Sequence, residues 1–228
     1  MENKKIFVAF DLDDTLYKEI DFLRSAYREI ASKVEAETNL SNVYENMMQD
    51  YYAGNDVFQN LVNQMSGLIT KDILLEIYRN HIPDICLNHD ARRCLDALFE
   101  IGIPMGIITD GRSQTQRNKI KMLGLEQWIP KDNWIISEEI GTEKPNQNNY
   151  MVLEHKYPDY HYIYVGNNPK KDFKGANELG WMTVCLLDSG EEIHPQNFQM
   201  EEFYLPQIKI VSLIDIKSLI DKKNAYER

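Results

Sequence analysis

Short apolar runs recur along the chain, and each is flanked by residues typical of loops. The runs lie at residues 6–10, 103–109, 134–137, 162–165, 183–187 and 208–211. They are hydrophobic almost without interruption, which is typical of strands covered on both faces in a parallel sheet. Amphipathic stretches of helical length separate most of them, near residues 89–100, 113–123, 146–156 and 170–179. This alternation predicts an α/β protein with a doubly wound, mostly parallel sheet.

One long interval departs from the alternation. From about residue 18 to residue 85 the pattern is helical, and breaks at residues 39–42, Gly54-Asn55 and Gly67 predict about four helices. We therefore expect a helical lobe at residues 18–85, inserted into a core made of residues 1–17 and 86–228. The insertion follows the first strand. Because ligands bind at the carboxyl ends of strands in open α/β sheets, we expect the lobe to cover a site at that edge.

Two acidic residues directly follow the first predicted strand. Asp11 and Asp13 lie in the segment Asp11-Leu12-Asp13-Asp14-Thr15. If the chain stays extended past the strand, residues two apart point to the same side, so both carboxylates can face one crevice. A polar turn that caps the next helix would use the same residue types. The pair alone leaves both interpretations open.

Three later segments carry further polar groups at strand ends or in loops. The second run ends in Thr109-Asp110-Gly111, a loop before a predicted helix contains Lys144-Pro145, and the fourth run leads through Gly166-Asn167-Asn168 to Asp172. Together with the D-x-D-x-T segment at the first strand, they resemble, in order, the four signatures of the haloacid dehalogenase superfamily. The resemblance covers most of the chain and extends to the phosphatase branch, with a helical cap inserted after the first strand.

The resemblance implies a phosphoric monoester hydrolase and a role for each motif. Asp11 would attack phosphorus and form an aspartyl-phosphate, and Asp13 would protonate the leaving alcohol and then activate water. The implied catalytic set is Asp11, Asp13, Thr109 and Lys144, and the implied substrate-binding set is Thr109, Asp110, Gly111, Arg112 and Lys144. The implied cofactor is Mg²⁺, with ligands at Asp11, Asp13, Asn167 and Asp172.

Formal charge is consistent with a metal ion in this crevice. The carboxylates of Asp11, Asp13 and Asp172 and the ammonium of Lys144 sum to −2, which would repel a phosphate dianion. One Mg²⁺ would bring that sum to zero. Magnesium prefers one or two carboxylates together with substrate oxygens and water, so the donor types suit it.

Asn167 departs from the family pattern, which has an acid at this position. An amide oxygen is neutral, so we expect this protein to need more Mg²⁺ than typical relatives, unless Asp172 carries more of the load. The Gly-Asn-Asn-Pro segment also fits a simple turn. Two other functions stay open. A 2-haloacid dehalogenase-type hydrolase uses no metal, but Asp13 argues against it, because a halide leaving group needs no proton donor. A catalytically weak phosphate-ligand-binding protein has only Asn167 in its favour.

Composition narrows the range of partners. The 228 residues carry a formal charge of −11, which repels polyanions and makes nucleic acid and anionic membranes poor partners. Three scattered cysteines predict a reducing, cytoplasmic compartment, and the apolar runs fall short of the about 18 residues of a membrane span. We expect a soluble monomer or homodimer that acts on a small phosphorylated metabolite, either a nucleoside monophosphate or a sugar phosphate. The sequence leaves the choice between them open.

Overall fold

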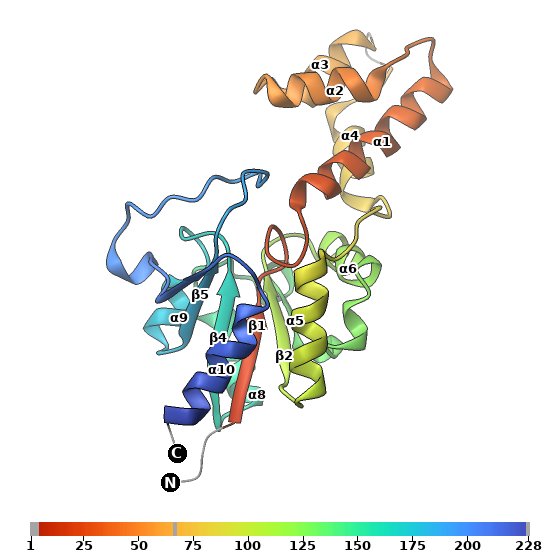
Figure 1. Cartoon of the computed structure of the whole chain (residues 1–228). Coiled ribbons are helices and arrows are strands. Elements are labelled where there is room, and N and C mark those ends of the chain that lie inside the picture. Colours follow the sequence, from red (N-terminus) through yellow and green to blue (C-terminus); the bar gives the residue numbers. More distant parts are fainter. Residues whose placement is uncertain (1–4, 66–67, 227–228) are drawn as a thin grey trace. The chain divides into compact units, whose positions relative to one another are not determined.

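A computed structural model describes residues 5–65 and 68–226 of the chain (Figure 1). The chain divides into two compact units. One contains the residues up to Glu19 together with those from Cys86 onward, and the other is Ile20–Ile85. The second unit is therefore an insert in the first. It begins shortly after strand β1 (Lys5–Phe10) and ends just before helix α5 (His89–Glu100).

The core of the larger unit is a parallel sheet. Among the described residues, six strands pair in the order β3-β2-β1-β4-β5-β6, and every pairing is parallel. Besides β1, the strands are β2 (Met105–Thr109), β3 (Trp134–Ile136), β4 (Tyr160–Gly166), β5 (Met182–Leu186) and β6 (Ile208–Ile210). Helices cover both faces of the sheet (Figure 1). The predicted doubly wound parallel sheet is confirmed, since each apolar run of the sequence overlaps one of these strands.

The remaining elements of this unit connect the strands. They are α6 (Ser113–Met122), α7 (Ser137–Ile140), α8 (Asn148–Lys156), α9 (Lys174–Glu178), α10 (Asp215–Tyr226) and the short 3₁₀ turns η1 (Leu125–Gln127), η2 (Lys131–Asn133) and η3 (Glu202–Tyr204). The helix predicted near residues 170–179 is shorter than expected. It begins only at Lys174, because the preceding loop wraps around the side chain of Asp172, which accepts the backbone N–H groups of Asn167 and Asn168 at 3.0 and 2.7 Å.

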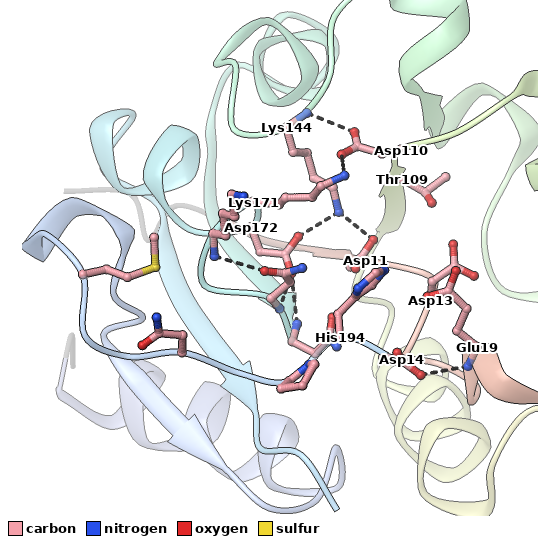
Figure 2. Close-up of a pocket in the computed structure, with 16 residues that line it drawn as sticks. Asp11, Asp13, Asp14, Glu19, Thr109, Asp110, Lys144, Lys171, Asp172 and His194 are labelled. Atoms are coloured by element: carbon pink, nitrogen blue, oxygen red, sulfur yellow. Dashed lines mark hydrogen bonds and ion pairs between the residues drawn. The ribbon is translucent and has the colours of Figure 1, made fainter. Parts of the chain in front are cut away.

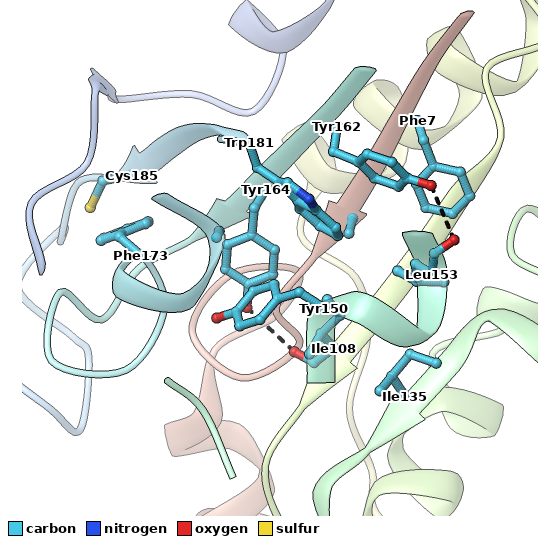
Figure 3. Close-up of a cluster of buried hydrophobic side chains, with 12 residues drawn as sticks. Phe7, Ile108, Ile135, Tyr150, Leu153, Tyr162, Tyr164, Phe173, Trp181 and Cys185 are labelled. Atoms are coloured by element: carbon cyan, nitrogen blue, oxygen red, sulfur yellow. Dashed lines mark hydrogen bonds between the residues drawn. The ribbon is translucent and has the colours of Figure 1, made fainter. Parts of the chain in front are cut away.

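Aromatic side chains fill the core beneath α8 and α9 (Figure 3). The rings of Tyr162 and Trp181 are stacked with their centroids 4.3 Å apart, and Tyr150 meets Trp181 edge to face at 5.5 Å. The hydroxyl of Tyr150 donates to the backbone oxygen of Asp172 at 2.8 Å. Tyrosine thus gives this core large apolar faces and polar tips that reach the loop after β4.

The inserted unit is helical. Over the residues of it that the structure describes, the helices are α1 (Glu19–Glu37), α2 (Val43–Tyr52), α3 (Val57–Gln64) and α4 (Lys71–Asn80). The side chains of Asp56 and Thr70 cap the starts of α3 and α4 by accepting backbone N–H groups of the first turn. The helix break expected at Gly67 lies outside the described residues. No helix in the described part of the chain is both long enough and apolar enough to span a membrane.

Close packing at Gly175 in α9 gives a testable stability prediction. An alanine here gains helix propensity of about 1 kcal/mol, whereas overpacking a dense site costs about 1–3 kcal/mol. A β-carbon would lie 2.4 Å from the carbonyl oxygen of Pro145 and 2.7 Å from the ring of Tyr150, so we expect Gly175→Ala to lower the stability of the core unit. Thermal unfolding measures this. The exposed Glu178 of the same helix supplies the control Glu178→Ala, and equal melting temperatures for the two variants would contradict the packing argument.

Candidate active site

The chemical groups singled out in the sequence gather where the strands end. Asp11 directly follows β1, Thr109 ends β2, and Asn167 directly follows β4. These strands are adjacent and parallel, so their carboxyl ends meet at one edge of the sheet. A cavity of about 470 Å³ lies there (Figure 2). Of the predicted site residues, those that line it are Asp11, Asp13, Thr109, Asp110, Lys144, Asn167 and Asp172.

The other two predicted substrate-binding residues lie differently. Arg112 is exposed at the start of α6 and is not among the residues that line the cavity. Gly111 has a φ of +138°, and its N–H donates to the hydroxyl of Ser137 at 2.9 Å. That N–H group is therefore already engaged within the protein. Binding of substrate by Arg112 or Gly111 stays a prediction that this geometry does not favour.

Lys144 forms the centre of a buried charge cluster. Its ammonium lies 2.6 Å from Asp11 Oδ1 and 2.7 Å from Asp172 Oδ1, and the residue is 5% exposed. Burial acts to lower the pKa of Lys144, but the two carboxylates outweigh it and raise that pKa well above its usual value. The lysine therefore keeps its positive charge. Its backbone N–H also donates to Asp110 Oδ1 at 3.0 Å, which ties its loop to the end of β2.

Asp172 is completely buried, and both of its oxygens already accept hydrogen bonds. Oδ1 accepts from Lys144 and from the hydroxyl of Tyr164 at 3.1 Å, and Oδ2 accepts the backbone N–H groups of Asn167 and Asn168. A carboxylate offers about four lone-pair positions, so these donors use its capacity. The geometry therefore favours a role for Asp172 in organising the loop over the metal-ligand role expected from the sequence.

Asp11 lies at the inner wall of the cavity and is 7% exposed. Burial is the largest influence on it and raises the pKa of this carboxyl well above the usual 3.8, while the nearby Lys144 opposes the rise. One ammonium shared with Asp172 thus leaves the negative charge at Asp11 incompletely compensated. Additional positive charge beside Asp11 would stabilise its ionised form.

Asp13 is held by donors from two elements. Lys119 of α6 lies 2.7 Å from Oδ1, the hydroxyl of Tyr17 donates to the same oxygen in a short hydrogen bond, and Gln116 Nε2 donates to Oδ2 at 2.9 Å. Burial alone would raise the pKa of Asp13, but Lys119 and these hydrogen bonds together lower it below its usual value. Gln116 Nε2 also donates to Thr109 Oγ1 at 2.6 Å, which links Asp13 to the end of β2.

Two further acids in the cavity were not predicted from the sequence. Burial raises the pKa of Asp14 to about 6 and that of Glu19 to about 8, the latter with help from the charges of Asp13 and Asp14. Asp14 Oδ2 accepts the backbone N–H of Ile193 at 3.3 Å. This contact anchors the segment that follows β5, which contributes His194, Pro195, Asn197 and Met200 to the cavity wall. The segment has no periodic pattern or known motif that would have indicated this position.

The donor set of the cavity suits a magnesium ion. Asp11 offers a carboxylate and Asn167 an amide oxygen at the same wall, and both are hard oxygen donors. Within the described ranges, no group of three or more His, Cys, Asp or Glu side chains gathers as a metal site. A cation held by Asp11 and Asn167 would complete its shell with water and substrate oxygens, which is the usual arrangement for magnesium.

Comparisons with known proteins agree with this geometry. Residues 8–186 match the family model described as haloacid dehalogenase-like hydrolase. A glyceraldehyde 3-phosphate phosphatase from Methanocaldococcus jannaschii is 31% identical over 79% of this chain and 84% of its own length. A protein of the same name from Methanopyrus kandleri is 29% identical over 83% of this chain and 88% of its own length.

Solved structures show the same fold. The HAD-hydrolase YfnB from Bacillus subtilis, determined with bound magnesium, superposes with a TM-score of 0.69 over 96% of this chain and 100% of its own, at 18% identity. The family expected from the four motifs is thus confirmed by sequence, and its fold by structure. With the motif residues gathered at one edge of the sheet and most of the chain matched, the protein belongs to the haloacid dehalogenase-like hydrolases and is an enzyme of the phosphatase type.

Proposed function

We propose that the protein hydrolyses a small phosphate monoester through an aspartyl-phosphate on Asp11, with the help of Mg²⁺. The observation that carries this proposal is the convergence of Asp11, Asp13, Lys144 and Asn167 on one cavity. The two carboxylates can take different roles because different partners hold them: Lys144 contacts Asp11, whereas Lys119, Tyr17 and Gln116 contact Asp13. The names of the relatives support the phosphoryl substrate.

The first step transfers the phosphoryl group to Asp11. A bond forms between a carboxylate oxygen of Asp11 and phosphorus, the bond between phosphorus and the ester oxygen breaks, and Asp13 gives a proton to that oxygen. Asp13 must be protonated for this step, although its neighbours favour the ionised form. A phosphate dianion entering the cavity beside Asp13 raises the pKa of its carboxyl, because like charge disfavours ionisation.

The second step releases inorganic phosphate. Asp13, now a carboxylate, takes a proton from water, and the water oxygen attacks phosphorus as the bond to Asp11 breaks. The lowered pKa of Asp13 in the resting site keeps this carboxyl ionised, which is the form that can accept a proton. Lys144 stays cationic throughout and offsets negative charge at Asp11 and on the phosphoryl oxygens.

Magnesium would be held by the carboxylate of Asp11, the backbone carbonyl of Asp13 and the side-chain oxygen of Asn167, with Asp172 organising the loop that presents Asn167. When bound, it supplies positive charge to the phosphoryl oxygens. Including Lys119, which the sequence-based sum omitted, the side chains of Asp11, Asp13, Asp172, Lys144 and Lys119 sum to −1. A divalent cation would bring the sum over these five side chains to +1, which would favour binding of a phosphate dianion.

Among phosphate esters, a small sugar phosphate is the substrate class we propose. Two relatives that match most of this chain are named glyceraldehyde 3-phosphate phosphatases. Nucleoside monophosphates, which the sequence left open alongside sugar phosphates, are the second class. We further propose that the helical insert Ile20–Ile85 serves as a cap that governs access and selects the leaving group, since it enters the chain directly after the segment bearing Asp11 and Asp13.

The test of the function is phosphate release by the wild-type protein and by Asp11→Asn. We expect hydrolysis of triose and sugar phosphates that requires Mg²⁺, and a loss of at least about a thousandfold in kcat for the variant, because the covalent route needs the nucleophile. The matched control is Asp132→Asn, the same change at an exposed position. Full activity in Asp11→Asn would contradict the mechanism. Halide release from 2-haloacids would instead support a dehalogenase, and phosphate binding without turnover would support a ligand-binding protein.

A second prediction concerns Asn167. Asn167→Asp replaces a neutral oxygen donor with a carboxylate, so we expect the Mg²⁺ concentration for half-maximal activity to fall roughly tenfold, because affinity for hard cations rises with the charge of the ligands. Titration of activity and direct calorimetric titration with Mg²⁺ measure it. Asn168→Asp adds the same charge one residue further on and controls for general electrostatics. Equal tightening in both variants, or none in Asn167→Asp, would contradict ligation by residue 167.

A further inference from the structure

We propose that Lys119 is a positioning residue for Asp13. Together with Tyr17 and Gln116 it holds the Asp13 carboxylate in the orientation needed to protonate the leaving alcohol and later to take a proton from water. This inference rests on the proposed phosphatase function and adds a residue outside the four motifs. It concerns one edge of α6, a helix that contributes no residue to those motifs.

The burial of Lys119 points to a specific role. Lys119 and Gln116 are three positions apart in α6 and so lie on the same face of the helix. They are 3% and 2% exposed, so α6 turns two polar side chains toward the interior. A buried ammonium is costly unless it is paired and hydrogen-bonded. Here the pairing is with Asp13, at 2.7 Å.

The donors are divided between the two oxygens of Asp13. Oδ1 accepts from Lys119 and from the hydroxyl of Tyr17, a residue that is 1% exposed. Oδ2 accepts from Gln116, which also donates to Thr109. Donors at both oxygens, from α6 and from the loop after β1, fix the plane of the carboxylate. A carboxylate held in this way is aimed at one position in the cavity rather than free to rotate.

The two buried lysines of the site thus serve different aspartates. Lys144 contacts Asp11, the proposed nucleophile, and Lys119 contacts Asp13, the proposed acid and base. Loss of Lys119 should therefore impair proton transfer more than bond formation at Asp11. A lysine that only stabilised the fold would affect both steps alike, and this difference allows an experiment to separate the two roles.

The leaving group separates the steps. An alkyl phosphate needs a proton on the ester oxygen as the bond to phosphorus breaks, whereas 2,4-dinitrophenyl phosphate releases a stable phenolate that needs none. Hydrolysis of the aspartyl-phosphate needs a base to take a proton from water with either substrate. With the dinitrophenyl ester, a variant with a misplaced Asp13 should therefore phosphorylate Asp11 readily and then turn over slowly.

The experiment compares Lys119→Met with Lys121→Met, the same change at an exposed position of the same helix. For Lys119→Met we expect kcat to fall about 10- to 100-fold and KM to change less than about threefold. This loss is part of the rate enhancement of about 10²–10⁴ that general acid–base catalysis contributes. Rapid-quench measurement with 2,4-dinitrophenyl phosphate should show a burst near one phenolate per enzyme at close to the wild-type rate. Lys119→Arg, which keeps the charge, should recover much of the turnover.

Other outcomes overturn the inference. If Lys119→Met turns over as fast as Lys121→Met, Lys119 does not act through Asp13. The same conclusion follows if Lys119→Met loses burst rate and turnover to the same extent. If Lys119→Met does not fold, Tyr17→Phe provides the test. This variant removes one hydrogen-bond donor to Asp13 Oδ1 and leaves no charge unpaired. We expect its turnover to fall several-fold while the burst rate with 2,4-dinitrophenyl phosphate stays close to that of the wild type. Turnover equal to that of the wild type would overturn the proposal. Turnover by Asp11→Asn would refute the proposed function itself, which keeps the two failures distinct.

Discussion

The buried ammonium of Lys144 is the interaction on which the arrangement of the catalytic edge depends. It contacts Asp11 after β1 and Asp172 after β4, and it belongs to the loop that precedes α8. One positive charge therefore joins three segments that are distant in the sequence. Because each member of a buried ion cluster compensates the others, removing one leaves a buried charge without its partner. These ion pairs therefore fix the positions of the three segments relative to one another.

The hydrophobic core supports this cluster from below. Tyr150 donates to the backbone of Asp172, and Tyr164 donates to its carboxylate. Both rings belong to the aromatic cluster that packs against Trp181 (Figure 3). The packed rings of Tyr150 and Tyr164 thus fix the position of Asp172 at the sheet edge. The second lysine–aspartate pair, Lys119 with Asp13, is built from different elements, so the nucleophile and the acid–base residue are held by separate contacts.

The sheet could be predicted because buried parallel strands leave continuous apolar runs, and each run of the sequence became a strand. The motif residues could be placed at one edge because the ends of adjacent parallel strands coincide. The contacts of Lys119 and Gln116 with Asp13 could not be predicted from the sequence alone. Gln116 and Lys119 are polar residues on a polar helix, which usually indicates a solvated face, and only the structure shows that this face is buried. The position of Arg112 beside a motif suggested substrate contact, but the side chain is exposed and is not among the residues that line the cavity, so this contact stays a prediction.

The segment after β5 can vary in evolution separately from the catalytic groups. It forms part of the cavity wall through residues such as His194 and Met200, yet it bears none of the groups assigned to bond making and breaking. Asp14 accepts a backbone N–H of this segment, Lys18 pairs with its Glu192, and its Gln196 donates to the backbone oxygen of Asn167 at 2.7 Å. Mutations that diversify this stretch while sparing these contacts can therefore change which molecules are accepted and leave the reaction itself intact.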